Sequence, residues 1–240
     1  MKLKNNLLFI LFIFIFSKAY LLDLENLEKS ELKKLLLGKI DPQNFQYFVK
    51  IPPKYSIYTN LNLYIESNTL EAFIKMAKDA DNNGIKLFIV SAFRSFNTQK
   101  LIWERKWEKF KIKDDLEKAK EILKYSSMPA TSRHHWGTDI DINSVDDSYF
   151  KSFNGIKVYN WLLSNAGKYG FCMPYSKKRN NYGYNLEKWH WSYTNISKKM
   201  LYYYTNLISY DDIKGFYGDF LADDIDIINN YVLNIDESCK

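Results

Sequence analysis

Two short segments, 139–143 and 188–193, most constrain the fold of this 240-residue chain, because each alternates polar and apolar residues. A period of two is typical of a strand that buries only one face. Asp141 falls on the polar face of the first segment, and His190 falls on the polar face of the second. We therefore expect two strands that present these side chains to a common point, while their apolar faces pack behind them.

The rest of the chain predicts helices and one further strand around this pair. Residues 85–90 form an apolar run that is typical of a buried strand. Residues 67–69 are expected to cap a helix that runs to 83, and residues 177–185 are expected to form a loop or a hairpin. Apolar spacing predicts further helices at 24–37, 98–111, 114–125 and 158–169, and across most of 196–233. The simplest interpretation is a single α+β domain over residues 20–240.

Residues 1–19 have the pattern of a secretory signal peptide. A basic start precedes ten apolar residues from Leu7 to Phe16, and small residues stand at Ser17 and Ala19. The apolar run is shorter than the roughly 20 residues that span a bilayer. An alternative is an uncleaved anchor, which is the one way in which we expect this protein to contact a membrane. Either interpretation predicts an exported protein of the periplasm or cell envelope.

The charge of the chain does not favour nucleic-acid binding. The formal net charge of +6 includes Lys2, Lys4 and Lys18 of the predicted signal peptide; without them, 31 basic residues face 28 acidic ones, a balance of +3. Both signs alternate along the chain instead of forming a basic block. We expect no nucleic-acid partner, and we expect a monomer.

The chain has only two cysteines, Cys172 and Cys239. Two cysteines do not make a disulfide framework. Cys172 lies in an apolar stretch, which favours a buried thiol. A bridge between the two in an oxidising compartment is the less favoured alternative.

All three histidines of the chain lie in the two strand-associated motifs. His134 precedes Asp141 by seven residues, and His190 lies on the second strand. Two imidazoles and a carboxylate suit Zn²⁺ and leave one coordination position open for water. We therefore predict that His134, Asp141 and His190 bind one Zn²⁺ ion, against the alternative that so short a motif is purely structural. The side chain of His135, directly beside His134, is expected to point elsewhere.

Two further charged side chains would complete a hydrolytic site. Glu187 precedes His190 by three residues, where a carboxylate can move protons to and from a water molecule. Arg94 follows the strand predicted at 85–90 and can supply fixed positive charge to a carbonyl oxygen. Two interpretations remain open for Asp139: a partner of a histidine ligand, or a solvated strand residue. Trp136, Trp189 and Trp191 are expected in the core or in the walls of a cleft.

The pattern Ser132-x-His134-x-x-Gly137-x-x-x-Asp141 followed by Glu187-x-x-His190 resembles the zinc D-alanyl-D-alanine carboxypeptidases of the VanY type, in the lysostaphin and D-Ala-D-Ala metallopeptidase (LAS) group. Residues 91–99, from Ser91 to Gln99, look like the arginine motif of that family. The resemblance runs from about residue 36 to 193. Residues 194–240 form a C-terminal extension beyond it, which is expected to be helical.

The resemblance implies a small antiparallel sheet flanked by helices. It also implies that His134, Asp141 and His190 bind zinc, that Glu187 is the catalytic acid and base, and that Arg94 stabilises the transition state. Ser132 and Gln99 would position the peptide. Asp139 departs from the family, which often has alanine there.

The function that the resemblance implies is removal of the terminal D-Ala from peptidoglycan stem peptides. Three alternatives stay open. Two are enzymes that would use the same site: a D,D-dipeptidase, and an L,D- or L-Ala–D-Glu endopeptidase. The third is a cell-wall binding module with a structural zinc.

Overall fold

The structure, a computed structural model, describes residues 22–177 and 182–240. The predicted signal peptide, 1–19, lies outside the described residues, as does the middle of the loop expected at 177–185. Among the described residues, no helix has the length and apolar character that crossing a bilayer requires.

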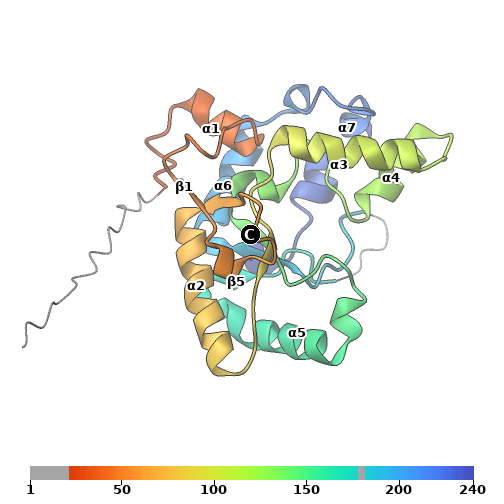
Figure 1. Cartoon of the computed structure of the whole chain (residues 1–240). Helices are drawn as coiled ribbons and strands as arrows, with labels where there is room; N and C mark the ends of the chain where they lie inside the picture. The colour runs from red at the N-terminus through yellow and green to blue at the C-terminus, as the bar shows by residue number, and fades with distance from the viewer. Residues whose placement is uncertain (1–21, 178–181) are drawn as a thin grey trace, which may run out of the picture.

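A small antiparallel sheet lies at the centre of the molecule (Figure 1). Its four strands, in spatial order, are β3 (Ile89–Ser91), β4 (Asp139–Ile142), β6 (His190–Tyr193) and β5 (Phe171–Cys172). The strands at 139–143 and 188–193 are thus confirmed as neighbours in the middle of the sheet, whereas the strand predicted at 85–90 begins only at residue 89. A separate two-stranded sheet pairs β1 (Phe48–Lys50) with β2 (Tyr64–Glu66).

Helices surround the sheet, and the predicted α+β class with a small antiparallel sheet is confirmed (Figure 1). The helix predicted at 158–169 begins earlier and gives way to a 3₁₀ turn at Ala166–Tyr169. The helices are α1 (Lys29–Leu36), α2 (Ser67–Asn82), α3 (Phe96–Lys109), α4 (Asp115–Leu123), α5 (Phe153–Asn165), α6 (Thr194–Leu207) and α7 (Leu221–Asp224).

The cap of α2 lies one residue before the predicted one. Glu66 precedes the helix, and its carboxylate accepts hydrogen bonds from the backbone N–H groups of Asn68, at 3.0 Å, and Thr69, at 2.8 Å. A carboxylate here satisfies free donors and lies at the positive end of the helix dipole. The prediction that residues 67–69 supply the cap is therefore wrong by one position.

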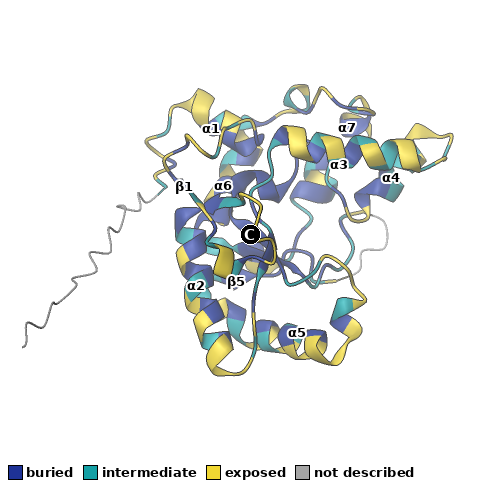
Figure 2. Cartoon of the chain, in the orientation of Figure 1, coloured by how far each residue is buried: buried dark blue, intermediate teal, exposed yellow. Residues whose placement is uncertain are grey.

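The apolar face of the sheet packs against α2 and α5. Ile140 and Trp191 are fully or almost fully buried in one apolar cluster with Phe73 of α2 and Leu162 of α5. Burying side chains of this size stabilises the fold by about 1.5–3 kcal/mol each. Exposed residues lie on the outer faces of the same two helices (Figure 2). This packing turns the opposite, polar face of β4 and β6 toward the site.

Residues 194–240 form the C-terminal extension, which is less regular than predicted. Only α6 is a long helix. After it come the short helix α7 and single helical turns at Tyr210–Asp212, Ile228–Val232 and Glu237–Cys239. This extension packs over α3, where the indole N–H of Trp103 donates a 2.7 Å hydrogen bond to the carbonyl of Tyr217.

The two cysteines form a disulfide, so the expectation of a buried thiol at Cys172 is wrong. Cys172 on β5 is bonded to Cys239, 67 residues later, with their Cα atoms 5.7 Å apart. The reason is the path of the C-terminal extension, which returns to β5 and places the N–H of Asp236 2.9 Å from the carbonyl of Pro174. Contacts between segments so distant along the chain leave no local pattern in the sequence.

Candidate active site

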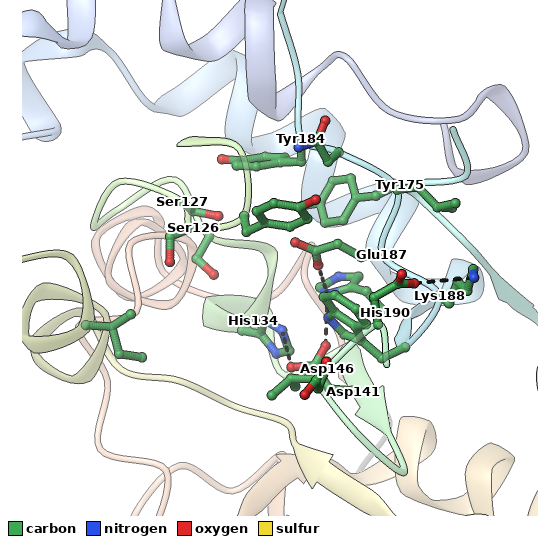
Figure 3. Close-up of a pocket in the computed structure, with 18 of the residues that line it drawn as sticks. Ser126, Ser127, His134, Asp141, Asp146, Tyr175, Tyr184, Glu187, Lys188 and His190 are labelled. Atoms are coloured by element: carbon green, nitrogen blue, oxygen red, sulfur yellow. Dashed lines mark ion pairs between the residues drawn. The ribbon is translucent and has the colours of Figure 1, made fainter. Parts of the chain in front are cut away.

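His134, Asp141 and His190 come together as predicted (Figure 3). Asp141 on β4 lies directly opposite His190 on β6, and His134 lies in a 3₁₀ turn, Arg133–Trp136, just before β4. Gly137 ends that turn with a φ of 71°, and a side chain there would collide with the ring of Phe48. One donor atom from each of the three residues lies within 4.8 Å of the other two. All three side chains are buried.

Hydrogen bonds behind the cluster determine which ring nitrogens face it. The backbone carbonyl of Ala92 lies 2.8 Å from Nδ1 of His134 and can only accept, so this nitrogen carries the proton and Nε2 is free. Nε2 of His190 lies 3.0 Å from the carboxylate of Asp139, which leaves Nδ1 free. Metal-binding histidines are held in this way by outer carbonyl or carboxylate groups.

The two free nitrogens converge on the two oxygens of Asp141. His134 Nε2 lies 3.3 Å from Oδ2, and His190 Nδ1 lies 3.2 Å from Oδ1. Ligand atoms about 2.0–2.1 Å from a tetrahedral zinc ion stand about 3.3 Å apart, and each ring nitrogen lies at about this spacing from one of the two Asp141 oxygens. Oδ1 is buried and accepts no hydrogen bond of acceptable geometry from the described residues. A cation between the three side chains would satisfy that oxygen.

Asp139 is the buried partner of His190, and not a solvated strand residue. Its Oδ1 accepts a 2.8 Å hydrogen bond from Nε of Arg133, and its Oδ2 accepts 2.9 Å hydrogen bonds from the hydroxyls of Thr138 and Ser192. Burial opposes the charge on Asp139, but Arg133 and His190 outweigh it and hold the pKa of this carboxyl below its usual value. The buried Arg133–Asp139 pair therefore keeps a carboxylate fixed against the candidate metal ligand.

The carboxylates of Asp139 and Asp141 give the cluster a negative charge. Burial alone would lower the pKa of His190, but the neighbouring carboxylates of Asp139 and Asp141 raise it to about 9. The site therefore favours a positive charge where the ring nitrogens meet, and a metal ion would supply that charge.

His135 does not face the cluster, in agreement with the sequence. Its ring is fully buried, with Nδ1 2.6 Å from the carbonyl of Arg94 and Nε2 accepting from the N–H of Ala130 at 3.1 Å. Burial lowers the pKa of His135 to about 3, so the ring is neutral. It ties the loop that carries Arg94 to the turn that carries His134.

Arg94 lies beside the cluster, with its NH2 nitrogen 3.6 Å from Oδ2 of Asp141. The guanidinium is held from behind, because NH1 donates to Gln99 Oε1 at 2.8 Å and NH2 donates to Ser91 Oγ at 3.0 Å. Gln99 is itself fully buried and donates to the carbonyl of Ser127 at 2.7 Å. Gln99 is not among the residues that line the site, so it contacts Arg94 and not the space where a peptide would lie.

Glu187 lies at the edge of the cluster, with Oε2 3.7 Å from Nδ1 of His190. Figure 3 shows its carboxylate between His190 and the ring of Tyr175. Burial raises the pKa of Glu187 to about 8. A carboxyl group with a pKa near neutrality can both accept and return a proton.

These side chains open into a pocket of about 850 Å³. Its size is within the usual range for small-ligand sites. Ser132 lines it, where the sequence places a substrate-contacting residue, as does Trp189, one of the tryptophans expected in a cleft wall. Tyr175 and Tyr184 form an aromatic wall above Glu187 (Figure 3).

Several residues of this pocket and of the contacts behind it could not be predicted from the sequence. Tyr175 and Tyr184 precede the Glu187 motif in an irregular segment, and no spacing marks them. The Arg133–Asp139 ion pair could have been predicted, because two opposite charges lie six residues apart inside the His134 motif. The aromatic wall continues into the C-terminal extension, since the ring of Tyr231 lies 5.3 Å from that of Tyr184.

Two histidines, an aspartate and a nearby glutamate meet at a pocket beside an antiparallel sheet, and this arrangement is that of a metal-dependent peptidase. The profile of the VanY family, described as D-alanyl-D-alanine carboxypeptidase, matches residues 62–196. The chain belongs to the VanY family, and the predicted membership is confirmed.

The proteins that resemble the chain include two curated relatives and one solved structure. It is 32% identical over 139 residues to a putative carboxypeptidase, YodJ, of Bacillus subtilis, covering 57% of this chain and 48% of the relative. It is 25% identical over 183 residues to a D-alanyl-D-alanine carboxypeptidase of Enterococcus faecalis, covering 75% and 65%. The structure of the LD-carboxypeptidase LdcB superposes with a TM-score of 0.53 at 23% identity, covering 71% of this chain and 77% of that chain.

These matches establish the family and the fold. The chain spans about half of the B. subtilis relative and just under two thirds of the E. faecalis relative. The fold neighbour is an LD-carboxypeptidase, whereas the E. faecalis relative is a D-alanyl-D-alanine carboxypeptidase. Members of the family and its fold neighbours thus cleave different peptide bonds.

Proposed function

We propose that this protein is an exported zinc carboxypeptidase that removes the terminal D-Ala from peptidoglycan stem peptides. The observation that carries the proposal is the convergence of His134 Nε2 and His190 Nδ1 on the carboxylate of Asp141, beside Glu187 and Arg94. A structural zinc site is usually closed by four protein ligands. Here three ligands and an adjacent carboxyl group face a pocket, which favours catalysis over a cell-wall binding module.

Zinc held by His134, Asp141 and His190 would lower the pKa of a water molecule and polarise the scissile carbonyl. Glu187 accepts the proton from the attacking water and then delivers it to the leaving amine. Glu187 lines the pocket with its Oε2 3.7 Å from Nδ1 of His190, which places a carboxylate beside the proposed ligands for both transfers. Arg94, fixed by Gln99 and Ser91, donates to the oxygen that gains negative charge. Ser132 lies in the pocket wall, where it would hold the peptide.

The predicted signal peptide and the Cys172–Cys239 disulfide together support export. Disulfides persist in oxidising compartments outside the cytoplasm. Stem peptides of peptidoglycan are found there, and we propose them as the substrate. The proposed domain division is 1–19 as signal peptide and 20–240 as one peptidase domain.

The test is the product that the purified protein releases from defined stem peptides in the presence of zinc. We expect free D-Ala from a pentapeptide that ends in D-Ala–D-Ala, detected by mass spectrometry. Release of the D-Ala–D-Ala dipeptide would indicate a D,D-dipeptidase. Release of D-Ala from a tetrapeptide alone would indicate an L,D-carboxypeptidase, and a cut before D-Glu an endopeptidase. Each of these results would contradict the proposed bond specificity.

A further inference from the structure

Helix α3 contributes one cation to the wall of the catalytic pocket. Lys106 lines the pocket, and its Nζ donates a 2.9 Å hydrogen bond to the hydroxyl of Ser126, which lines the same pocket. An ammonium group has three N–H donors, and this bond uses one of them. Lys106 is thus held in place by Ser126 with donors to spare.

Lys106 differs from the other two Lys or Arg side chains among the described residues that line the pocket. Arg94 lies beside Asp141, and Lys188 lies 3.3 Å from Asp147. Lys106 forms no ion pair with a carboxylate of any described residue. Burial lowers the pKa of Lys106, and the charge of Glu187 partly restores it. The pocket therefore contains a partly desolvated ammonium group that forms no close ion pair with any carboxylate of the described residues.

A bound carboxylate would supply a close counter-ion. The leaving residue of a carboxypeptidase substrate carries a free α-carboxylate only one Cα away from the scissile nitrogen. Such a group must bind close to the catalytic acid and base, and Lys106 lines the same pocket as Glu187 and Arg94. An endopeptidase substrate has an amide at this position and gains nothing from a cation there.

We propose that Lys106, oriented by Ser126, binds the C-terminal α-carboxylate of the residue that the enzyme releases. This inference rests on the proposed carboxypeptidase function and deepens it, because it makes Lys106 the residue that selects free chain ends over internal bonds. The second source of a carboxylate in these substrates is an acidic residue further back in the stem peptide. The test separates the two sources.

The test compares Lys106→Met with the unaltered protein on three peptides. The first ends in D-Ala–D-Ala with a free carboxylate, and the second is the same peptide with a C-terminal amide. The third is the free acid with D-isoglutamine in place of D-Glu, which removes only the upstream carboxylate. A hydrogen bond to a charged group contributes about 1.5–3 kcal/mol, which is roughly 10- to 100-fold in binding. We expect Lys106→Met to raise KM for both free acids by that factor, with little change in kcat. The slow cleavage of the amide should stay unchanged.

Two further variants control the result. Lys109→Met removes an exposed lysine from the same helix and should leave all three rates unchanged. Lys106→Arg keeps the charge and should restore most of the preference for the free acid. Zinc content and melting temperature of each variant separate a loss of fold from a loss of binding.

Three outcomes would overturn the inference or its basis. If Lys106→Met still prefers the free acid as strongly as the unaltered protein, Lys106 does not bind the terminal carboxylate. If Lys106→Met raises KM for the first peptide but not for the D-isoglutamine peptide, the carboxylate that Lys106 binds is the upstream one. If the unaltered, zinc-loaded protein cleaves none of the peptides, the proposed function itself fails.

Discussion

Oδ1 of Asp139 lies 3.0 Å from Nε2 of His190, and this contact leaves Nδ1 of His190 free to face His134 and Asp141. The same oxygen accepts from Nε of Arg133 at 2.8 Å, so Asp139 is fixed on both sides. A carboxylate behind a histidine ligand orients the ring and raises its basicity. The carboxylate of Asp139 therefore acts directly on the proposed zinc ligand His190.

We predict that loss of Asp139 weakens zinc binding by about 10- to 100-fold. Asp139→Ala alone would leave Arg133 buried without a counter-ion, which costs about 3–5 kcal/mol of stability. The double variant Arg133→Met with Asp139→Ala removes both charges and should recover much of the stability but not the zinc affinity. Competition with a chromophoric chelator measures the affinity. A matched control is Asp147→Ala, which removes a carboxylate that lines the same pocket away from the cluster. Unchanged affinity in the double variant would show that Asp139 only balances Arg133.

Glu187→Gln should keep the zinc and lose turnover. The side chain is not one of the three proposed ligands, and the amide cannot accept the proton of water. We expect kcat to fall by about 10²- to 10⁴-fold, the usual contribution of a general acid–base group. Metal analysis and substrate-binding calorimetry on the same sample provide the control. Substantial residual turnover would assign the proton transfers to another group.

Arg94→Ala should lower kcat by about 10²- to 10³-fold, as expected when a donor to the developing oxyanion is lost. Gln99→Ala should have a smaller effect, because Gln99 holds the guanidinium and does not line the pocket. Steady-state kinetics on one pentapeptide measures both. If Gln99→Ala proved as damaging as Arg94→Ala while its melting temperature held, Gln99 would have a direct role in substrate binding.

Loss of the disulfide should destabilise the fold without changing the chemistry. Cys172 and Cys239 are 67 residues apart, and removing a bridge typically costs about 2–5 kcal/mol. The double variant Cys172→Ser with Cys239→Ser should show this loss in chemical denaturation, while kcat measured at low temperature stays near the original value. A large fall in kcat with little loss of stability would instead link the bridge to the pocket, for example through the contact between Tyr231 and Tyr184.

The residues of the candidate metal site could be predicted from the sequence because the information is local. His134 and Asp141 lie in one motif, Glu187 and His190 in another, and strand alternation determines which side chains share a face. The register that places Asp141 opposite His190 follows from the need to bury Ile140 and Trp191 on the other side.

The features that could not be predicted depend on contacts between distant segments. The Cys172–Cys239 bridge and the approach of Tyr231 to Tyr184 both require the path of the C-terminal extension, which carries no local signal. The burial of Asp139 also depends on packing, because an alternating strand pattern is the same whether its polar face meets water or a buried arginine. Gln99 illustrates the same limit: the motif marks it as important, but only the fold places it behind Arg94.

The most direct test is a zinc titration of the metal-free protein, with D-Ala release from a pentapeptide as the readout. We expect activity to rise in proportion to added zinc and to reach its plateau at one ion per chain. His190→Ala, shown to be folded, should neither bind that ion tightly nor gain activity. Full activity in the presence of a strong chelator, or zinc binding that raises the melting temperature without any turnover, would contradict the account.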